Sequence, residues 1–337
     1  MAEYGIFLLK AITIVVAIIV VFAFLASLSM RQRKSSKGHI EVTKLNERLK
    51  SYKELMQQSL LSKDELKKHA KEEKKQAKAK KKQASEPARK RVFVINFEGD
   101  TQASAVENLR EEVTTVLSTA DKKDEVVVKV ESPGGTVHGY GLAASQLSRI
   151  KDQGVNLTVC VDKVAASGGY MMACVADKIL SAPFAILGSI GVVAQLPNFN
   201  RFLKKHDVDF ELHTAGEYKR TLTVFGENTD EGREKFQSDL ESIHRLFKDF
   251  VKKNRSQLDL DEVAHGDFWF GQDAMEKNLV DRICTSDQYL QDLSANSDIF
   301  EVTYKQKKSI QDRLGVAASV AMEKTLFKVA QRWNWIS

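Results

Sequence analysis

Two glycine-containing motifs hold the residues whose types and spacing could do chemistry. SPGG (132–135) ends an apolar run, and AASGGY (165–170) precedes a stretch of helical periodicity that opens on Ser167. Glycine lets a backbone N–H approach a ligand without a Cβ in the way, and the first N–H groups of a helix have no intrahelical partner. The two loops could therefore hold an oxyanion beside a serine nucleophile, although each could equally be a tight turn.

A nucleophilic Ser167 needs a base to take its proton. None of the seven histidines stands in a compelling sequence relation to Ser167 (His39, His69, His138, His206, His213, His244 and His265). Lysine is the alternative base. Lowering the pKa of a lysine from about 10.4 to near 7 costs roughly 4 to 5 kcal/mol, which burial in an apolar site can supply. Lys219 follows an expected strand and Gly216, but composition alone does not separate it from a solvated surface lysine.

The elements that must position these residues alternate along the chain from Arg91 onward. Short apolar runs rich in β-branched residues predict strands, and apolar residues at helical spacing predict helices. This alternation predicts an α/β domain with largely parallel pairing. The expected strands are 92–97, 126–131, 157–161, 178–182, parts of 185–193, and 209–214; the expected helices are 103–120, 139–152, 167–176, 198–206 and 230–254; and a short helix runs into a strand over 272–283.

A long apolar run lies near the start of the chain. Residues 6–29 carry one charge, Lys10, and they exceed the roughly 20 residues that cross a bilayer as a helix. A cleaved signal peptide would have a basic start and a shorter apolar stretch, whereas this chain starts MAEYG. We therefore expect a transmembrane anchor at 1–30. The basic residues at 31–37 favour a cytoplasmic location for the rest of the chain.

Charge is distributed unevenly along the chain. The whole chain has a net charge of +6, yet residues 31–91 hold 21 Lys and Arg against 8 Asp and Glu, so residues 92–337 are net acidic. The segment 31–91 predicts a charged stalk, either solvated and partly helical or in contact with anionic lipid headgroups. An acidic main body gives no reason to expect a nucleic-acid partner. The three cysteines lack metal-site or disulfide spacing (Cys160, Cys174 and Cys284), so no metal is expected.

Over about residues 92–290 the chain resembles peptidase family S49, the signal peptide peptidase A group. Five motifs in the same order carry the resemblance. Asn278 departs from the family pattern, which more commonly has glycine there. The motifs are SPGGTVHG (132–139), AASGGY (165–170), LGSIGVV (187–193), GEYKR (216–220) and FWFGQDAMEKNLVDRI (268–283).

The resemblance implies a ClpP/crotonase-like α/β superhelix at 92–295. The sequence pattern itself predicts a C-terminal strand and an amphipathic helix at 296–337. It implies that Ser167 is the nucleophile and that Lys219, 52 positions downstream, is the base. Ser189 would orient the lysine amine, and the N–H groups of Gly135 and Gly168 would hold the oxyanion. A ClpP-type triad has a histidine about two dozen residues after its serine, where this chain reads GVVAQ (191–195).

The resemblance further implies a serine endopeptidase of the bacterial inner membrane that needs no cofactor. Its substrates would be peptides or membrane and exported proteins, and its anchor would contact membrane lipids. Family members form rings, so we expect a homo-oligomer in which Ser167 and Lys219 of one site come from neighbouring copies. The family's link to exported proteins favours the periplasmic side, against the charge rule. Two rivals share the fold: an acyl-CoA enzyme, which leaves the anchor and the Ser–Lys pair unexplained, and a catalytically silent membrane scaffold.

Overall fold

The computed structural model describes residues 13, 38–68, 71–72, 75 and 89–306. The chain divides into two compact units, one formed by residues 41–303 and the other by the terminal segments 1–40 and 304–337. Among the described residues, no helix is both long and apolar enough to cross a bilayer. Apart from Thr13, the expected anchor at 1–30 lies outside the described residues, and so does the expected amphipathic helix after residue 306.

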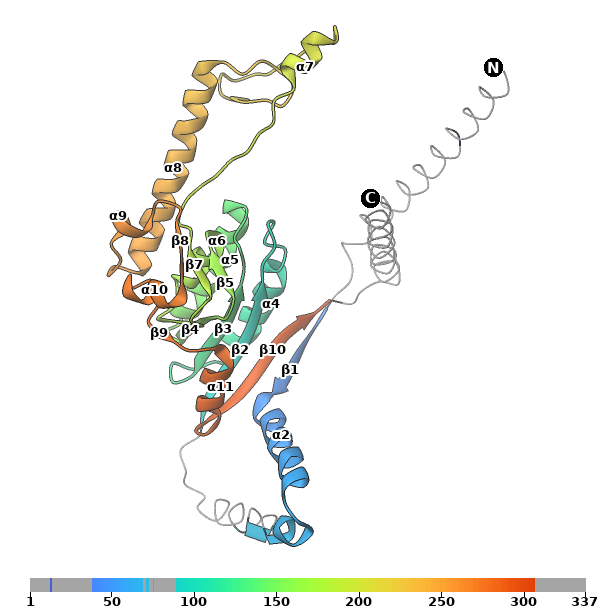
Figure 1. Ribbon diagram of the computed structural model, residues 1–337, viewed down its shortest axis with the longest axis vertical. Coiled ribbons are helices and arrows are strands. Elements are labelled where there is room, and N and C mark those ends of the chain that lie inside the picture. Colours follow the sequence, from blue (N-terminus) through green and yellow to red (C-terminus); the bar gives the residue numbers. More distant parts are fainter. Residues whose placement is uncertain (1–12, 14–37, 69–70, 73–74, 76–88, 307–337) are drawn as a thin grey trace, which may run out of the picture. The chain divides into compact units, whose positions relative to one another are not determined.

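A seven-stranded sheet forms the centre of the fold, which is of the α/β class (Figure 1). Its strand order is β1-β10-β2-β3-β4-β6-β9, and from β10 to β9 every neighbouring pair is parallel. Apart from the strand expected at 209–214, the expected strands in the body of the chain are confirmed, with small shifts at their ends. The strands are β1 (His39–Lys44), β2 (Lys90–Glu98), β3 (Glu125–Glu131), β4 (Asn156–Val161), β6 (Lys178–Ser181), β9 (Arg282–Ile283) and β10 (Ser297–Lys305).

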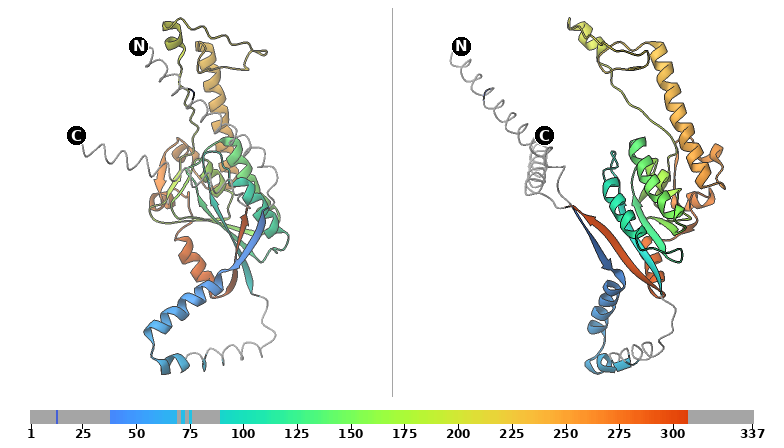
Figure 2. Two further views of the ribbon diagram at one scale, coloured as in Figure 1. Left: turned by 90° about the vertical axis from the view of Figure 1, so that its right-hand side faces the viewer. Right: turned by 180° about the vertical axis from the view of Figure 1, so that it is seen from behind.

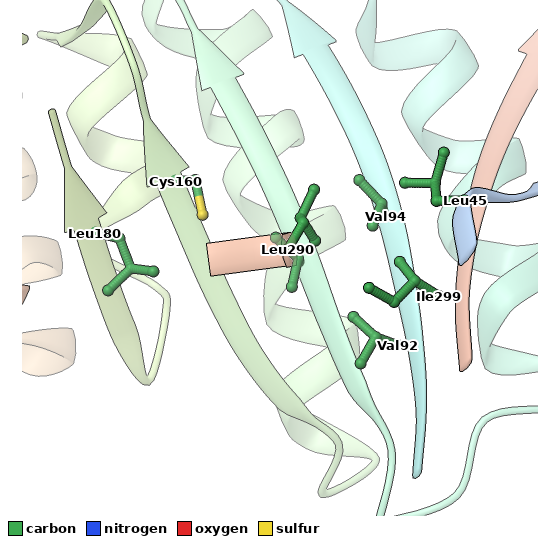
Figure 3. Packing of buried hydrophobic residues seen from close by; sticks show 8 residues of the cluster. Leu45, Val92, Val94, Cys160, Leu180, Leu290 and Ile299 are labelled. Carbon is green, nitrogen blue, oxygen red and sulfur yellow. The ribbon is translucent and has the colours of Figure 1, made fainter. Parts of the chain in front are cut away.

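The two faces of the sheet are covered by different helices, because successive side chains of a strand point to opposite faces. On one face, Val92 and Val94 of β2 belong to a buried cluster with residues of α11 (Ser286–Ser294) and of α2 (Leu45–Leu60) (Figure 3). On the other face, Phe97 of β2 contacts the ring of Tyr140 in α5 (Val137–Asp152). Helix α4 (Val106–Leu117) packs against α5 and β2.

A second, three-stranded sheet lies where the two glycine motifs meet. Its order is β5-β7-β8, with β5 (Val164–Ala166) parallel to β7 (Ile186–Gly188) and β7 antiparallel to β8 (Phe268–Phe270). Helix α6 (Gly168–Ala173) follows β5 directly. The chain leaving β3 joins this sheet through a parallel bridge between Ser132 and Ala165. Both glycine motifs are therefore fixed by strand pairing.

The outlying segment, residues 196–229, leads from β7 towards α8 (Asp230–Asn254), which has the predicted bounds. It contains α7 (Asn200–Lys205). Figures 1 and 2 place the chain between α7 and α8 beyond the N-terminal end of α8, away from β7 and β8. The strand expected at 209–214 is wrong: these residues are irregular and exposed. A strand needs a pairing partner, and none of the described strands pairs with them.

Elements from both ends of the described chain join the main sheet. Strand β1 lies in the range expected to be a stalk, and it neighbours β10, the expected C-terminal strand. Helix α2 follows β1 and supplies the helical part expected there. The remaining described helices are short: α9 (Leu260–Val263) and α10 (Gly271–Glu276), the latter at the expected helix in 272–283. The domain boundaries at 30, 91 and 295 remain predictions.

Candidate active site

Ser167 stands at the turn between β5 and α6. Its φ of 51° and ψ of −117° are rare for a residue with a side chain, and such strained conformations gather at functional sites. Backbone hydrogen bonds hold it there: the Ser167 N–H donates to Gly188 O at 2.8 Å, and the Met171 N–H donates to Ser167 O at 2.9 Å. The side chain is partly exposed, so the turn presents a hydroxyl on a well-fixed backbone.

The register of β5 and β7 brings Ser189 to the same place. Ala166 lies opposite Gly188, so the two parallel strands end side by side and are followed by Ser167 and Ser189. Ser189 also has a positive φ, 51°, and its N–H donates to Asp267 O at 2.6 Å. Two serines that are 22 positions apart in sequence thus line one cavity.

The SPGG loop closes over Ser167 from β3. A Cβ on Gly134 would come within 2.7 Å of Ser167 Cβ and 2.8 Å of Gly168 N, and its φ is +91°. Only glycine suits such a position. The Gly134 N–H donates to Ser132 Oγ at 3.0 Å. No acceptor in the described chain takes the N–H of Gly135 or Gly168, and Gly168 is the first residue of α6, where such groups have no intrahelical partner.

A cavity of about 620 Å³ opens at this point. Ser167, Ser189, Gly135 and Gly168 line it. Part of its wall is apolar, as in most sites that hold a ligand side chain; this part contains Val137, Met171, Val192, Ile243 and Phe247. The arrangement can place a carbonyl carbon at a serine hydroxyl, with two backbone donors near its oxygen and an apolar side chain in the cavity.

Lys219 lies apart from this group. It does not line the cavity, and no described lysine does. It belongs to the exposed stretch 211–220 of the outlying segment, where its N–H donates to Gly216 O at 3.1 Å. Within one copy, the structure brings together four of the five predicted site residues and leaves the fifth outside the cavity.

The cavity is also lined by two histidines, His244 of α8 and His265. Neither residue was singled out by sequence reasoning. His244 Nε2 lies 3.2 Å from Ile190 O, and His265 Nε2 lies 2.6 Å from Asp261 O. These carbonyls accept from the ring N–H, so in a neutral ring the other nitrogen is an acceptor. Nothing in the spacing from Ser167 could have revealed these residues, because long-range packing of α8 and of the chain after α9 brings them to the cavity.

Sequence comparison assigns the chain to a family. Residues 1–147 match the family description "Peptidase family S49 N-terminal" and residues 149–299 match "Peptidase family S49". The protein named "Probable protease SohB" of Haemophilus influenzae is 49% identical over 342 residues, covering 98% of this chain and 95% of the relative. Its namesake in Buchnera aphidicola subsp. Acyrthosiphon pisum is 52% identical over 248 residues, covering 74% of each.

Among solved structures, the chain is similar to a mutant of the 1510-N membrane-bound stomatin-specific protease in complex with a substrate peptide. The identity is 13%, the TM-score is 0.36, and the match covers 68% of this chain and 97% of the other. The family assignment rests on the sequence matches, which span nearly the whole chain. The chain belongs to peptidase family S49, a family of serine peptidases with a Ser–Lys dyad.

Proposed function

We propose that the protein is a membrane-anchored serine endopeptidase whose dyad is Ser167 of one copy and Lys219 of a neighbouring copy. The observation that carries the proposal is the incomplete cavity. Ser167 stands there on a strained turn beside two unoccupied backbone N–H groups, while no described lysine lines the cavity. A serine nucleophile needs a base, and a second copy can supply one.

In this proposal, the neutral amine of Lys219 takes the proton of Ser167 Oγ as that oxygen attacks the peptide carbonyl carbon. The negative charge on the carbonyl oxygen is held by the N–H groups of Gly135 and Gly168. As the tetrahedral intermediate collapses, the C–N bond breaks and Lys219 gives its proton to the leaving amine. Water, deprotonated by the same lysine, then hydrolyses the Ser167 ester. Ser189 would hold the lysine amine in place.

The apolar surface of the outlying segment supports an assembly of copies. Phe202 is 60% exposed, and Phe210 and Phe225, whose ring centroids lie 5.8 Å apart, stay exposed despite packing on each other. Exposed apolar groups of this kind mark interaction surfaces. A contact between this segment and a different surface of the next copy is heterologous, and such contacts form a ring when the rotation between successive copies closes. Tyr218, next to Lys219, is exposed as well.

Membrane attachment would come from the apolar run at 6–29, followed by the basic segment 31–91 facing anionic headgroups. The substrates would be peptides or membrane and exported proteins bound as extended chains. The apolar wall of the cavity favours an apolar side chain next to the cleaved bond. The catalytic domain would lie at the bacterial inner membrane.

The full chain in detergent, incubated with an unfolded protein substrate and with a serine-directed fluorophosphonate, tests the proposal. The parent should cleave the substrate and be labelled at Ser167. Ser167→Ala and Lys219→Ala should both lose turnover. A parent that assembles but is neither active nor labelled would overturn the proposal and favour the silent scaffold.

One observation favours a different base, because His244 and His265 already line the cavity. The same assay separates the two candidates. If a cavity histidine is the base, His244→Ala or His265→Ala should abolish turnover and Lys219→Ala should leave it nearly intact. The reverse pattern is expected from the Ser–Lys dyad, with the histidine variants retaining most of the labelling rate.

A further inference from the structure

A buried chain of hydroxyl groups connects the SPGG loop to α5. The Gly134 N–H lies 3.0 Å from Ser132 Oγ, Ser132 Oγ lies 2.5 Å from the Tyr140 hydroxyl oxygen, and that hydroxyl lies 2.8 Å from Asp100 O. Ser132 and Tyr140 both have no exposed surface. Neither side chain has a role in the mechanism derived above.

The direction of this chain follows from the number of protons. Asp100 O can only accept, so the Tyr140 hydroxyl donates its one proton to that oxygen. Ser132 must then donate its own proton to Tyr140, and the Ser132 oxygen is left to accept from the Gly134 N–H. Hydrogen bonds aligned head to tail polarise and strengthen one another. The loop beside Ser167 is thus held by a relay that begins at the Asp100 carbonyl, just after β2.

Tyr140 also contacts the second oxyanion donor. A Cβ on Gly168 would lie 2.3 Å from Cγ of the Tyr140 ring, so the ring lies directly against the backbone that begins α6. The ring is itself held edge-on by Phe97, at a centroid distance of 6.3 Å. One side chain is therefore linked to both segments that carry the proposed oxyanion donors: its hydroxyl bonds to the Ser132 side chain of the SPGG loop, and its ring lies against Gly168.

We propose that Tyr140 and Ser132 are positioning residues that set the spacing between the N–H groups of Gly135 and Gly168. Fixing the Gly134 N–H on Ser132 turns the next peptide, whose N–H belongs to Gly135, toward the cavity rather than toward Ser132. This inference rests on the proposed peptidase mechanism. The function of the pair is to align donors with an oxygen that bears charge only in the transition state, so it should act on turnover more than on binding.

The protonation state of Tyr140 is consistent with this positioning role. Burial raises the pKa of the phenol, with the nearby Asp100 carboxylate acting in the same direction and the bond to Ser132 opposing it. Tyr140 thus keeps its proton throughout the range in which a peptidase would work, and the relay keeps one direction. Within the part of the chain that the structure describes, Asp100 is the ionisable group that acts on the phenol.

Tyr140→Phe tests the inference, because it removes the hydroxyl and keeps the ring against Gly168. The matched control is Tyr170→Phe: Tyr170 is also fully buried, and its hydroxyl donates to Leu279 O at 3.0 Å. We expect Tyr140→Phe to lower kcat by about tenfold or more, somewhat below the effect of deleting an oxyanion donor. KM should change by no more than about twofold, as for an interaction made only in the transition state.

A peptide aldehyde that forms a tetrahedral adduct with Ser167 gives a second readout. Its Ki should rise in parallel with the fall in kcat for Tyr140→Phe and for Ser132→Ala, and should stay near the parent value for Tyr170→Phe. A kcat of Tyr140→Phe no lower than that of Tyr170→Phe would overturn the inference while leaving the proposed function standing. An inactive, correctly assembled parent would overturn both. If Tyr140→Phe does not fold, Ser132→Ala decides by the same two measurements.

Discussion

The region around Ser167 and the region around Lys219 differ in how much of the protein holds them. Ser167 follows a paired strand, begins a buried helix and makes two backbone hydrogen bonds. Lys219 lies in a stretch where every residue from 211 to 220 is exposed and irregular. The first region is fixed by its own chain, whereas the second carries apolar side chains with little to cover them.

The contrast indicates that one copy can position the nucleophile of the dyad alone, but not the lysine base. Strand register can place a nucleophile and backbone donors within a fraction of an ångström. A lysine base needs an apolar shelter to lose its proton, and the exposed stretch 211–220 offers none within one copy. We infer that the shelter forms only when the outlying segment meets a neighbouring copy, which makes activity depend on assembly.

The largest effect on turnover is expected at Ser167. Ser167→Ala should lower kcat by about 10⁴-fold or more, as for loss of the nucleophile in other serine peptidases. The thermal midpoint should change little, because no described residue forms a buried hydrogen bond with this hydroxyl. A steady-state assay with a melting curve checks both. Retained turnover in a preparation free of other peptidases would rule out Ser167 as nucleophile.

The second-largest effect is expected at Lys219, in the exposed region. Lys219→Ala should lower kcat by about 10³-fold, since general-base catalysis contributes roughly 10²- to 10⁴-fold. Lys205→Ala, in exposed α7 of the same segment, is the matched control and should stay within about twofold of the parent. Equal activity for the two variants would show that Lys219 is an ordinary surface lysine.

The third prediction concerns the exposed apolar surface of the outlying segment. Phe202→Asp should break the assembly and lower turnover at least about tenfold, because it places a charge in an apolar contact. Met56→Asp in α2, at a residue that is 59% exposed against 60% for Phe202, should change neither. Sedimentation velocity with a parallel activity assay gives both readouts. A fully active Phe202→Asp monomer would contradict shared sites.

The smallest expected effect concerns Glu125 of β3, in the main sheet that supports the region around Ser167. Burial tends to raise the pKa of Glu125, but hydrogen bonds from Lys90, Tyr289 and Thr158 outweigh it and lower that pKa below the ordinary 4.5. A lowered folded-state pKa gives stability that is present above 4.5 and lost as pH falls through the folded value. Glu125→Gln should cost about 1 to 3 kcal/mol at neutral pH.

Urea unfolding followed between pH 3 and pH 7 measures this effect as the free energy of unfolding. The parent should lose stability steadily below about pH 4.5, where Glu125 begins to protonate in the unfolded state. The Glu125→Gln variant should show a shallower loss over the same range. Identical pH profiles would mean that Glu125 adds no pH-dependent stability.

The sequence predicted most of what local pattern controls. The helix at 230–254 has the expected bounds because its apolar spacing and its Thr229 cap are local signals. The two glycine motifs were found because their residues are contiguous. The juxtaposition of Ser167 with Ser189 needed the register of β5 and β7, which spacing does not encode.

What the sequence could not predict depends on distant packing. The expected strand at 209–214 has alternating apolar residues, but no described strand offers it an edge. His244 reaches the cavity only because α8 returns from the outlying segment. Strand β1 looked like part of a charged stalk, since its own residues are mostly exposed and its pairing lies with residues some 250 positions later.

Mixing two inactive variants tests whether Ser167 and Lys219 of one site belong to different copies. Ser167→Ala and Lys219→Ala are each dissociated, combined in equal amounts and allowed to reassemble. Activity should return to about a quarter of the parent value, because half of the serines are intact and, in a random heterologous ring, half of those meet an intact neighbouring lysine. Activity no higher than that of the separate variants, in rings shown to contain both, would rule out a site shared between copies.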